Sequence, residues 1–260
     1  MRELDLSVKF LHCLPKYEYL ESALRDGLML MDHDVKFSVT DDKDQLARLL
    51  NDLIPLIEFK LKMLGLELNS LPHDSSQNLF AGIGTMQGSV PMICVTEVAP
   101  GRLISQHRFL FGSFGLVHRN LWVARNNAER IIYAGHGSPA SKILFNCLAT
   151  MHIMGLHVSQ DGLLVFDTRT HKAALPLLSY FESRDNVSEA EWRIAGSTGY
   201  FGGKRNTGER LPLQLEEIEY IFTPNAILKD EIQVVVDELA VVQSCKRAPQ
   251  VIVFPDAIPE

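Results

Sequence analysis

Residues 90–98 read Val-Pro-Met-Ile-Cys-Val-Thr-Glu-Val, and the interpretation of the fold begins with this run. The run is almost continuously apolar and partly β-branched, which is typical of a buried strand. Pro100 and Gly101 follow it and end the strand. A Gly-Ser-Phe-Gly turn at residues 112–115 then leads to a second strand around residues 116–118. The sequence therefore predicts a buried strand here, closely followed by another.

Further strands and helices are expected on both sides of this segment. Apolar periodicity predicts strands at residues 4–11, 130–134, 163–166, 192–195, 218–222 and 251–254. It predicts helices at residues 16–28, 46–57, 102–111, 138–153 and 229–239. Gly27 suits a left-handed helix end, Pro55 interrupts or kinks the second helix, and residues 69–89 and 196–208 are predicted loops. Because strands and helices do not alternate strictly, we expect an α+β fold, a single domain over residues 1–260 with a mixed or antiparallel sheet and flanking helices.

The composition narrows the class of protein. A chain of 260 residues with 46% hydrophobic and 22% charged residues is typical of a globular protein with a large core. Its 25 basic and 32 acidic residues give a net charge of −7, which does not favour non-specific nucleic-acid binding. No apolar run reaches ~18 residues and the start does not resemble a signal peptide, so we expect a cytoplasmic protein without a membrane span. Four widely spaced cysteines are then expected to be reduced thiols.

The common catalytic and cofactor motifs are incomplete in this sequence. Gly82, Gly84 and Gly88 lack the spacing of a dinucleotide-binding loop, and residues 137–142 differ from a phosphate-binding loop at essential positions. Ser197 lies in a sequence similar to a nucleophile elbow, but a glycine-rich loop follows where a helix is needed. The nine histidines form no paired metal-ligand motif, so we expect no metal site.

Three stretches, taken in order, do resemble known families. Residues 10–12 (Phe-Leu-His), followed by Tyr-Leu-Glu-Ser-Ala-Leu-Arg-Asp-Gly-Leu at residues 19–28, are similar to the opening of DarT-like ADP-ribosyltransferases. Residues 90–98, continued by His-Arg-Phe-Leu-Phe-Gly-Ser-Phe-Gly-Leu at residues 107–116, resemble the AbiGi family of bacterial abortive-infection proteins. Residues 189–193 (Glu-Ala-Glu-Trp-Arg) and 211–224 resemble later motifs of the same family. Phe111 stands where the family has tyrosine, so this chain has no phenolic hydroxyl at that position.

The resemblance implies a role in phage defence and a cognate AbiG-type partner protein. Its more remote part implies the split sheet of ADP-ribosyltransferases and NAD as a substrate. Transfer from NAD breaks the bond between nicotinamide and ribose through an oxocarbenium-like transition state, which a well-placed carboxylate stabilises.

The candidate residues follow from that chemistry. Glu191 is the candidate catalytic carboxylate, and Glu189, on the same face of the strand, would orient the acceptor. His12, Arg193 and His107 are the candidate NAD-binding residues, and a neutral His12 imidazole can hydrogen-bond a ribose hydroxyl. Arg193 could instead pair with Glu191, and His107 could be a helix-surface or positioning residue.

A non-catalytic function is the alternative. In that interpretation Glu189 and Glu191 are solvated, and Arg193 completes an ordinary ion pair. The chain is then a binding module that holds a toxin partner or senses a phage product, and its acidic charge fits a partner with a basic face. The helix at residues 229–239 carries an apolar stripe that would serve core packing or, alternatively, partner binding.

Overall fold

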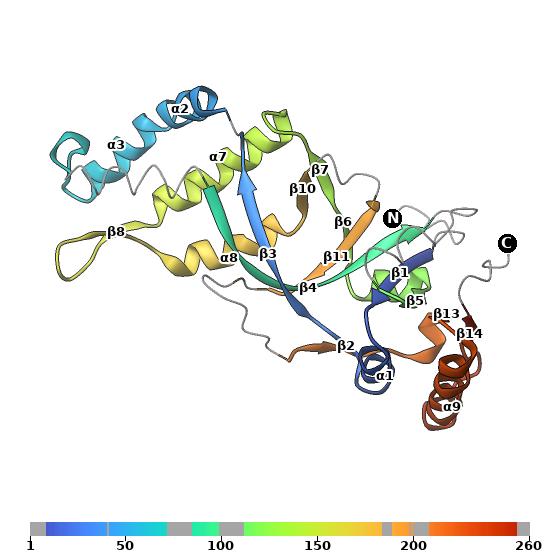
Figure 1. Cartoon of the computed structure of the whole chain (residues 1–260). Coiled ribbons are helices and arrows are strands. Elements are labelled where there is room, and N and C mark those ends of the chain that lie inside the picture. The colour runs from blue at the N-terminus through green and yellow to red at the C-terminus, as the bar shows by residue number, and fades with distance from the viewer. Residues whose placement is uncertain are drawn as a thin grey trace.

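The protein is an α+β structure built on one mixed sheet (Figure 1). The computed structural model describes residues 9–40, 42–71, 85–98, 112–183, 189–197, 199 and 208–253. These residues contain seven α-helices: α1 (Tyr17–Asp26), α2 (Lys43–Asn51), α3 (Ile54–Met63), α6 (Asn120–Arg125), α7 (Pro139–Met154), α8 (Thr168–Leu178) and α9 (Ala226–Val242). None of the helices in these described ranges is long and apolar enough to cross a membrane.

The main sheet has eight strands. Seven follow the order β14 (Gln250–Val253), β13 (Ile218–Thr223), β5 (Phe114–His118), β1 (Lys9–Leu14), β4 (Thr85–Val98), β11 (Glu191–Ala195) and β6 (Glu129–Arg130). The eighth, β3 (Met31–Ser38), also pairs with β4. The pairing of β13 with β14 is parallel and the other pairings are antiparallel, so the sheet is mixed.

Three two-stranded sheets complete the described strands. β2 (Leu28–Met29) pairs with β12 (Arg210–Leu211), and β8 (Leu156–Val158) pairs with β9 (Leu164–Phe166). β7 (Ile132–Ala134) pairs in parallel with β10 (Phe181–Ser183). The last of these sheets matters for the candidate site, because β7 and β10 lie next to β11 (Figure 1).

β4 is paired along its length by three strands. β3 pairs with residues 85–92, β1 with residues 96–98, and β11 with residues 92–96. Met92 pairs with residues of both β3 and β11, and Thr96 pairs with residues of both β1 and β11. β1 and β3 therefore lie one after the other along the same edge of β4, and residues 93–95 fall between their paired segments.

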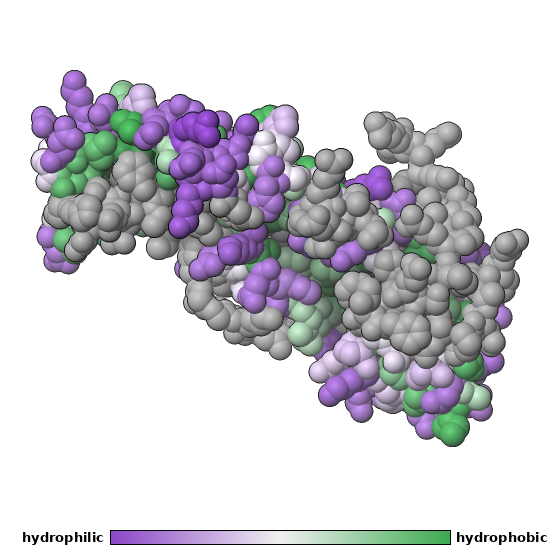
Figure 2. All heavy atoms as spheres, turned by 45° about the horizontal axis from the view of Figure 1, so that its top comes forward, coloured by the Kyte–Doolittle hydropathy of each residue, from purple (hydrophilic) through white to green (hydrophobic). Residues whose placement is uncertain are grey.

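Two hydrophobic cores lie on opposite faces of β4. Ile93 and Val95 pack with helices α1, α6 and α9, whereas Val90 and Met92 pack with α3, α7 and α8. Alternate residues of a strand point to opposite faces, so a strand that serves two cores must be apolar on both. The helices of the two cores lie at opposite ends of an elongated body (Figures 1 and 2).

The structure agrees with many of the predicted elements and differs at several. The α+β class, the buried strand at residues 90–98 and the helices corresponding to α1, α7 and α9 are confirmed. The helix expected at residues 46–57 is two helices, α2 and α3, because Pro55 occupies the first turn of α3. Residues 85–89, expected in a loop, belong to β4 because β3 pairs with them. The helix predicted at residues 102–111 lies outside the described residues.

Gly27 ends α1 with a positive φ, as expected, but its ψ differs from the left-handed helical region. Its φ is 93° and its ψ is 165°. An added Cβ would lie 2.3 Å from the carbonyl oxygen of Leu211 in β12, and Arg210 Nη1 donates to the Gly27 carbonyl at 2.8 Å. Gly27 is therefore required both by its dihedral angles and by the close approach of β12.

We expect Gly27→Ala to lower the free energy of unfolding by about 2–5 kcal/mol, measured by urea denaturation. This sums a penalty of ~1–2 kcal/mol for positive φ and ~1–3 kcal/mol for overpacking. Gly65→Ala is the matched control, because Gly65 has a φ of 73° and nothing within 4 Å of an added Cβ. It should cost only ~1–2 kcal/mol. Equal costs for the two variants would contradict the close approach of β12.

Candidate functional site

Strand β11 carries two of the predicted site residues into the interior. Glu191 pairs across the sheet with Thr96, and Arg193 pairs with Cys94. Glu191 and Arg193 are two residues apart, so both side chains point to the same face of the strand. Both are largely removed from solvent, with side-chain exposures of 9% for Glu191 and 11% for Arg193.

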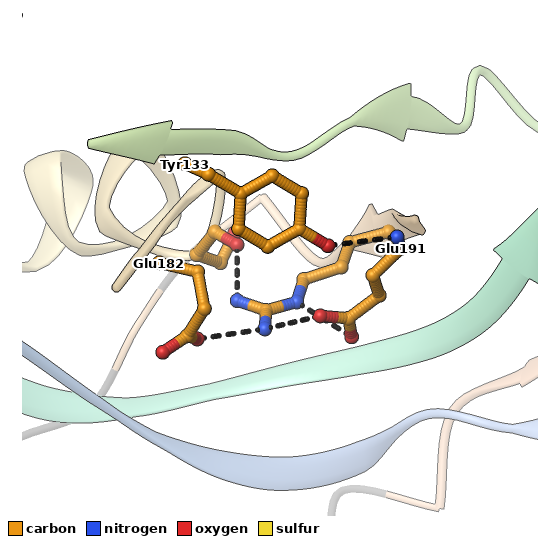
Figure 3. Close-up of polar contacts among 5 residues, drawn as sticks. Tyr133, Glu182 and Glu191 are labelled. Carbon is orange, nitrogen blue, oxygen red and sulfur yellow. Dashed lines mark hydrogen bonds and ion pairs between the residues drawn. The ribbon is translucent and has the colours of Figure 1, made fainter. Parts of the chain in front are cut away.

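The Arg193 guanidinium binds both oxygens of the Glu191 carboxylate (Figure 3). Its Nε donates to Oε1 at 2.9 Å and its Nη2 donates to Oε2 at 2.7 Å. Nη2 also donates to the carboxylate of Glu182 at 3.0 Å, and Nη1 donates to the carbonyl of Ser179 at 2.6 Å. Such a bidentate, charge-assisted pair is among the stronger polar interactions in proteins. We call Arg193, Glu191, Glu182 and Ser179 the Arg193 network.

Among the described residues, the carboxylates of Glu182, Glu189 and Glu191 all lie near the Arg193 guanidinium. Burial, followed by the charges of Glu191 and Glu182, raises the pKa of Glu189. Burial opposes the charged form of Arg193, but its hydrogen bonds to Glu191 and the charge of that carboxylate outweigh this effect and raise its pKa. Arg193 is therefore always charged and is the cation that the buried carboxylates share.

Two neutral side chains border the network. The backbone N–H of Glu191 donates to the Tyr133 hydroxyl at 2.8 Å, and burial, reinforced by charges of Glu191 and Glu189, raises the pKa of that phenol. Burial, followed by the charge of Glu191, raises the pKa of the Cys94 thiol well above its usual value. Cys94 is therefore a neutral thiol and not an activated nucleophile.

His12 lies on β1 near the point where β1 leaves β4. Its Nδ1 lies 2.8 Å from the carbonyl oxygen of Cys94 and donates to it. Burial is the largest influence on His12 and lowers its pKa. Leu11 is the cross-strand partner of Thr96, and Thr96 is the cross-strand partner of Glu191. Leu11 and Glu191 therefore have side chains on the same face of the sheet. The side chain of His12, the next residue, points to the opposite face.

The structure thus brings some of the predicted site residues together and separates others. Glu191, Arg193 and Glu189 lie close to one another, His12 lies on the other face of the sheet, and His107 lies outside the described residues. The expectation that Glu189 belongs to the strand is wrong, because β11 begins at Glu191 and Ala190 before it has a φ of 46°. The predicted pairing of Arg193 with Glu191 is present, but the expectation that Glu191 is solvated is wrong, because Glu191 is buried at the pair. The catalytic role of Glu191 stays a prediction.

Three residues of the site belong to no motif of the sequence. Tyr133 comes from β7, Glu182 comes from β10, and Ser179 follows α8. No motif joins these positions to Glu191, and only the tertiary fold brings them together. Among the described residues, no group of three or more His, Cys, Asp or Glu side chains could hold a metal ion.

A surface pocket of about 600 Å³ lies apart from the Arg193 network. Its walls come from α3, the end of α7 with β8, and the start of α8. Its lining includes Lys60, His157, Arg169 and Asp167, and Asp167 pairs with Arg169. Methionine and leucine residues also line it. None of the predicted site residues lines it.

Comparison with protein-family models, with curated proteins and with solved structures gives no match for this chain.

We expect Arg193→Met to lower the free energy of unfolding by about 3–5 kcal/mol, because it leaves the buried Glu191 carboxylate without its partner. The double variant Glu191→Leu/Arg193→Met should be more stable than Arg193→Met alone, because it removes both charges. Urea denaturation of both variants and of Glu191→Leu gives the interaction free energy between Glu191 and Arg193. Arg169→Met is the control, because Arg169 pairs with Asp167 at the surface and should cost no more than ~1 kcal/mol. An Arg193→Met cost no larger than this control would refute the structural role of the network.

His118, in β5, provides a test of acid sensitivity. It is fully buried, stacks on Trp122 with ring centroids 4.0 Å apart, and has no hydrogen-bond partner for either ring nitrogen. Burial, then the charge of His12, lowers its pKa well below the usual value. Below pH ~6.5 the unfolded chain therefore binds more protons than the folded protein at this site, so the free energy of unfolding decreases as the pH is lowered.

The free energy of unfolding should therefore decrease as the pH is lowered from ~7 to ~5. This decrease should be smaller in His118→Gln. His12 contributes in the same direction, whereas the raised pKa of Glu189 works in the opposite direction. Denaturation series across this range measure the slope. His157→Gln is the control because His157 is exposed, and its slope should match that of the parent protein. An unchanged slope in His118→Gln would show that His118 is not a buried neutral base.

Proposed function

We propose that this protein is a non-catalytic binding module of a phage-defence system that acts by holding a cognate partner protein. The observation that carries the proposal is the engagement of both Glu191 oxygens by Arg193. The resemblance to abortive-infection proteins supports the defence role and an AbiG-type partner. The net charge of −7 is compatible with a partner that has a basic face.

The environment of Glu191 disfavours its use in breaking the nicotinamide–ribose bond. A carboxylate that stabilises an oxocarbenium-like ribose must lie against that ribose with its negative charge available. Glu191 is buried, and a positive guanidinium lies against both of its oxygens. Its charge is already compensated, and removing Arg193 to admit a substrate would take this partner away from the buried Glu191 carboxylate.

The position of His12 gives independent support. A transferase pocket needs the ribose-binding group and the carboxylate on one side of the bound NAD ribose. The side chains of His12 and Glu191 point to opposite faces of the sheet, and Nδ1 of His12 donates a hydrogen bond to the Cys94 carbonyl.

NAD-dependent ADP-ribosyl transfer is the second candidate function, and the observation that favours it is the position of Glu189. Glu189 is partly exposed, unlike Glu191, and its raised pKa reflects burial and the two nearby carboxylates. In this alternative Glu189 faces the substrate, and Glu191 is a positioning residue that holds Arg193.

Titration calorimetry with NAD, together with an assay for released nicotinamide, separates the two functions. For a binding module we expect no heat of binding at millimolar NAD and no nicotinamide release. The proposal would be contradicted by two results together. One is a dissociation constant for NAD in the micromolar to low-millimolar range, about −8 to −4 kcal/mol, and the other is nicotinamide release that Glu189→Gln, Glu191→Gln or His12→Ala abolishes. His157→Ala is the control for nonspecific effects of histidine removal, and circular dichroism verifies that each variant is folded.

A further inference from the structure

The long helix α9 has an apolar face toward the core and a second apolar stripe toward solvent. Ile232, Val235 and Val236 are buried in the first core. On the solvent side, Ile227, Val234 and Val241 are 72%, 57% and 80% exposed. The helix is therefore apolar on two sides, and among the described residues only one of them packs in a core.

The three exposed residues form a regular stripe. They are seven residues apart, so they lie within roughly 40° of one another around the helix and span about 21 Å along it. Val and Ile have low helix propensity, and an exposed position would favour Ala, Glu or Lys. Local helix stability therefore does not explain three β-branched residues at these positions.

Acidic side chains flank this stripe on both sides. Asp230 and Asp237 lie roughly 60–80° to one side of Ile227, and Glu231 and Glu238 lie roughly 20–40° to the other. The first turn of α9 has no acidic residue and the last turn no basic residue, so these charges do not follow the helix dipole. We call the exposed Ile227, Val234 and Val241 with the four acids the α9 stripe. In Figure 2, hydrophobic and hydrophilic atoms adjoin at the end of the molecule that holds α9.

We propose that the α9 stripe docks a basic amphipathic helix of a partner protein, an inference that rests on the proposed binding function and specifies its surface. An apolar ridge of about 21 Å would pack against the valine and isoleucine side chains, and Lys or Arg residues beside the ridge would face the four carboxylates. Arg25 of α1 already shows this complementarity within the chain, because its Nη2 lies 3.2 Å from the Glu238 carboxylate.

A second copy of this chain fits the α9 stripe poorly. Two α9 helices packed through these stripes would bring four carboxylates from each copy close together. Like charges across an interface oppose association, and the chain already has a net charge of −7. The charge pattern therefore favours a different protein with a basic helix.

Binding of two synthetic helical peptides to the full chain tests the proposal. One has leucine at every seventh position and lysine on both sides of that ridge, and the other has glutamate in place of every lysine. By fluorescence anisotropy, the basic peptide should bind at least about tenfold more tightly than the acidic one, and added salt should weaken its binding. Equal binding of the two peptides, or no binding of the basic one, would overturn the proposal.

Two pairs of substitutions locate the binding surface. Val234→Gln/Val241→Gln and Asp230→Asn/Asp237→Asn should each weaken binding of the basic peptide about tenfold or more, and neither change removes a buried contact. Phe59→Gln/Met63→Gln on α3 is the matched control, because it also removes two exposed apolar side chains, and its binding should be unchanged. Equal effects of the α3 and α9 variants would overturn the assignment to α9.

Sedimentation velocity of the chain alone tests the self-association alternative. A monomer is expected, and a dimer that Val234→Gln/Val241→Gln dissociates would overturn the choice of a basic partner. These results are separate from the NAD measurements. Nicotinamide release dependent on Glu189 or Glu191 would refute the proposed function, whereas absence of NAD binding together with failure of the basic peptide would refute only the α9 stripe.

Discussion

The architecture depends on β4 being apolar on both faces. Val90 and Met92 bury in one core, and Ile93 and Val95 bury in the other. A strand that enters only one core can alternate apolar and polar residues, but this one cannot. Its length also allows β3 and β1 to pair in succession along the same edge. The two groups of helices at opposite ends of the molecule thus pack on opposite faces of the same strand (Figure 1).

The Arg193 network follows from the position of β11 beside this strand. β11 has β4 on one side, and β6 covers only its first residues on the other. Its inward charges are satisfied by one another, by Glu182 of β10 and by the Ser179 carbonyl after α8, whereas Tyr133 of β7 accepts from the backbone N–H of Glu191. Moving an ion from water into a protein interior costs several kcal/mol, so Glu191 and Arg193 are tolerated because each satisfies the other. The pairing that makes their burial tolerable also removes the free charge that catalysis by Glu191 requires.

Local patterns allowed part of this structure to be predicted. The buried run at residues 90–98 and the pairing of Glu191 with Arg193 involve neighbours in sequence, whose spacing determines which face they share. β3 was not predicted, because its charged residues obscure its period and β4 supplies the reason for its extended form. Glu182 and Tyr133 were not predicted because they meet Arg193 and Glu191 only through strands distant in sequence.

Charge is arranged differently inside and outside the molecule. Among the described interior residues, the Glu182 and Glu191 carboxylates both contact the Arg193 guanidinium directly. On α9 the acidic groups flank exposed apolar side chains, and Arg25 bridges Glu238 at the edge of that stripe. Buried charges that are already paired cannot gain much from a ligand, whereas carboxylates at an accessible surface can attract a basic partner and orient it. This distribution of charge therefore supports the proposed recognition through the surface of α9 over chemistry at Glu191.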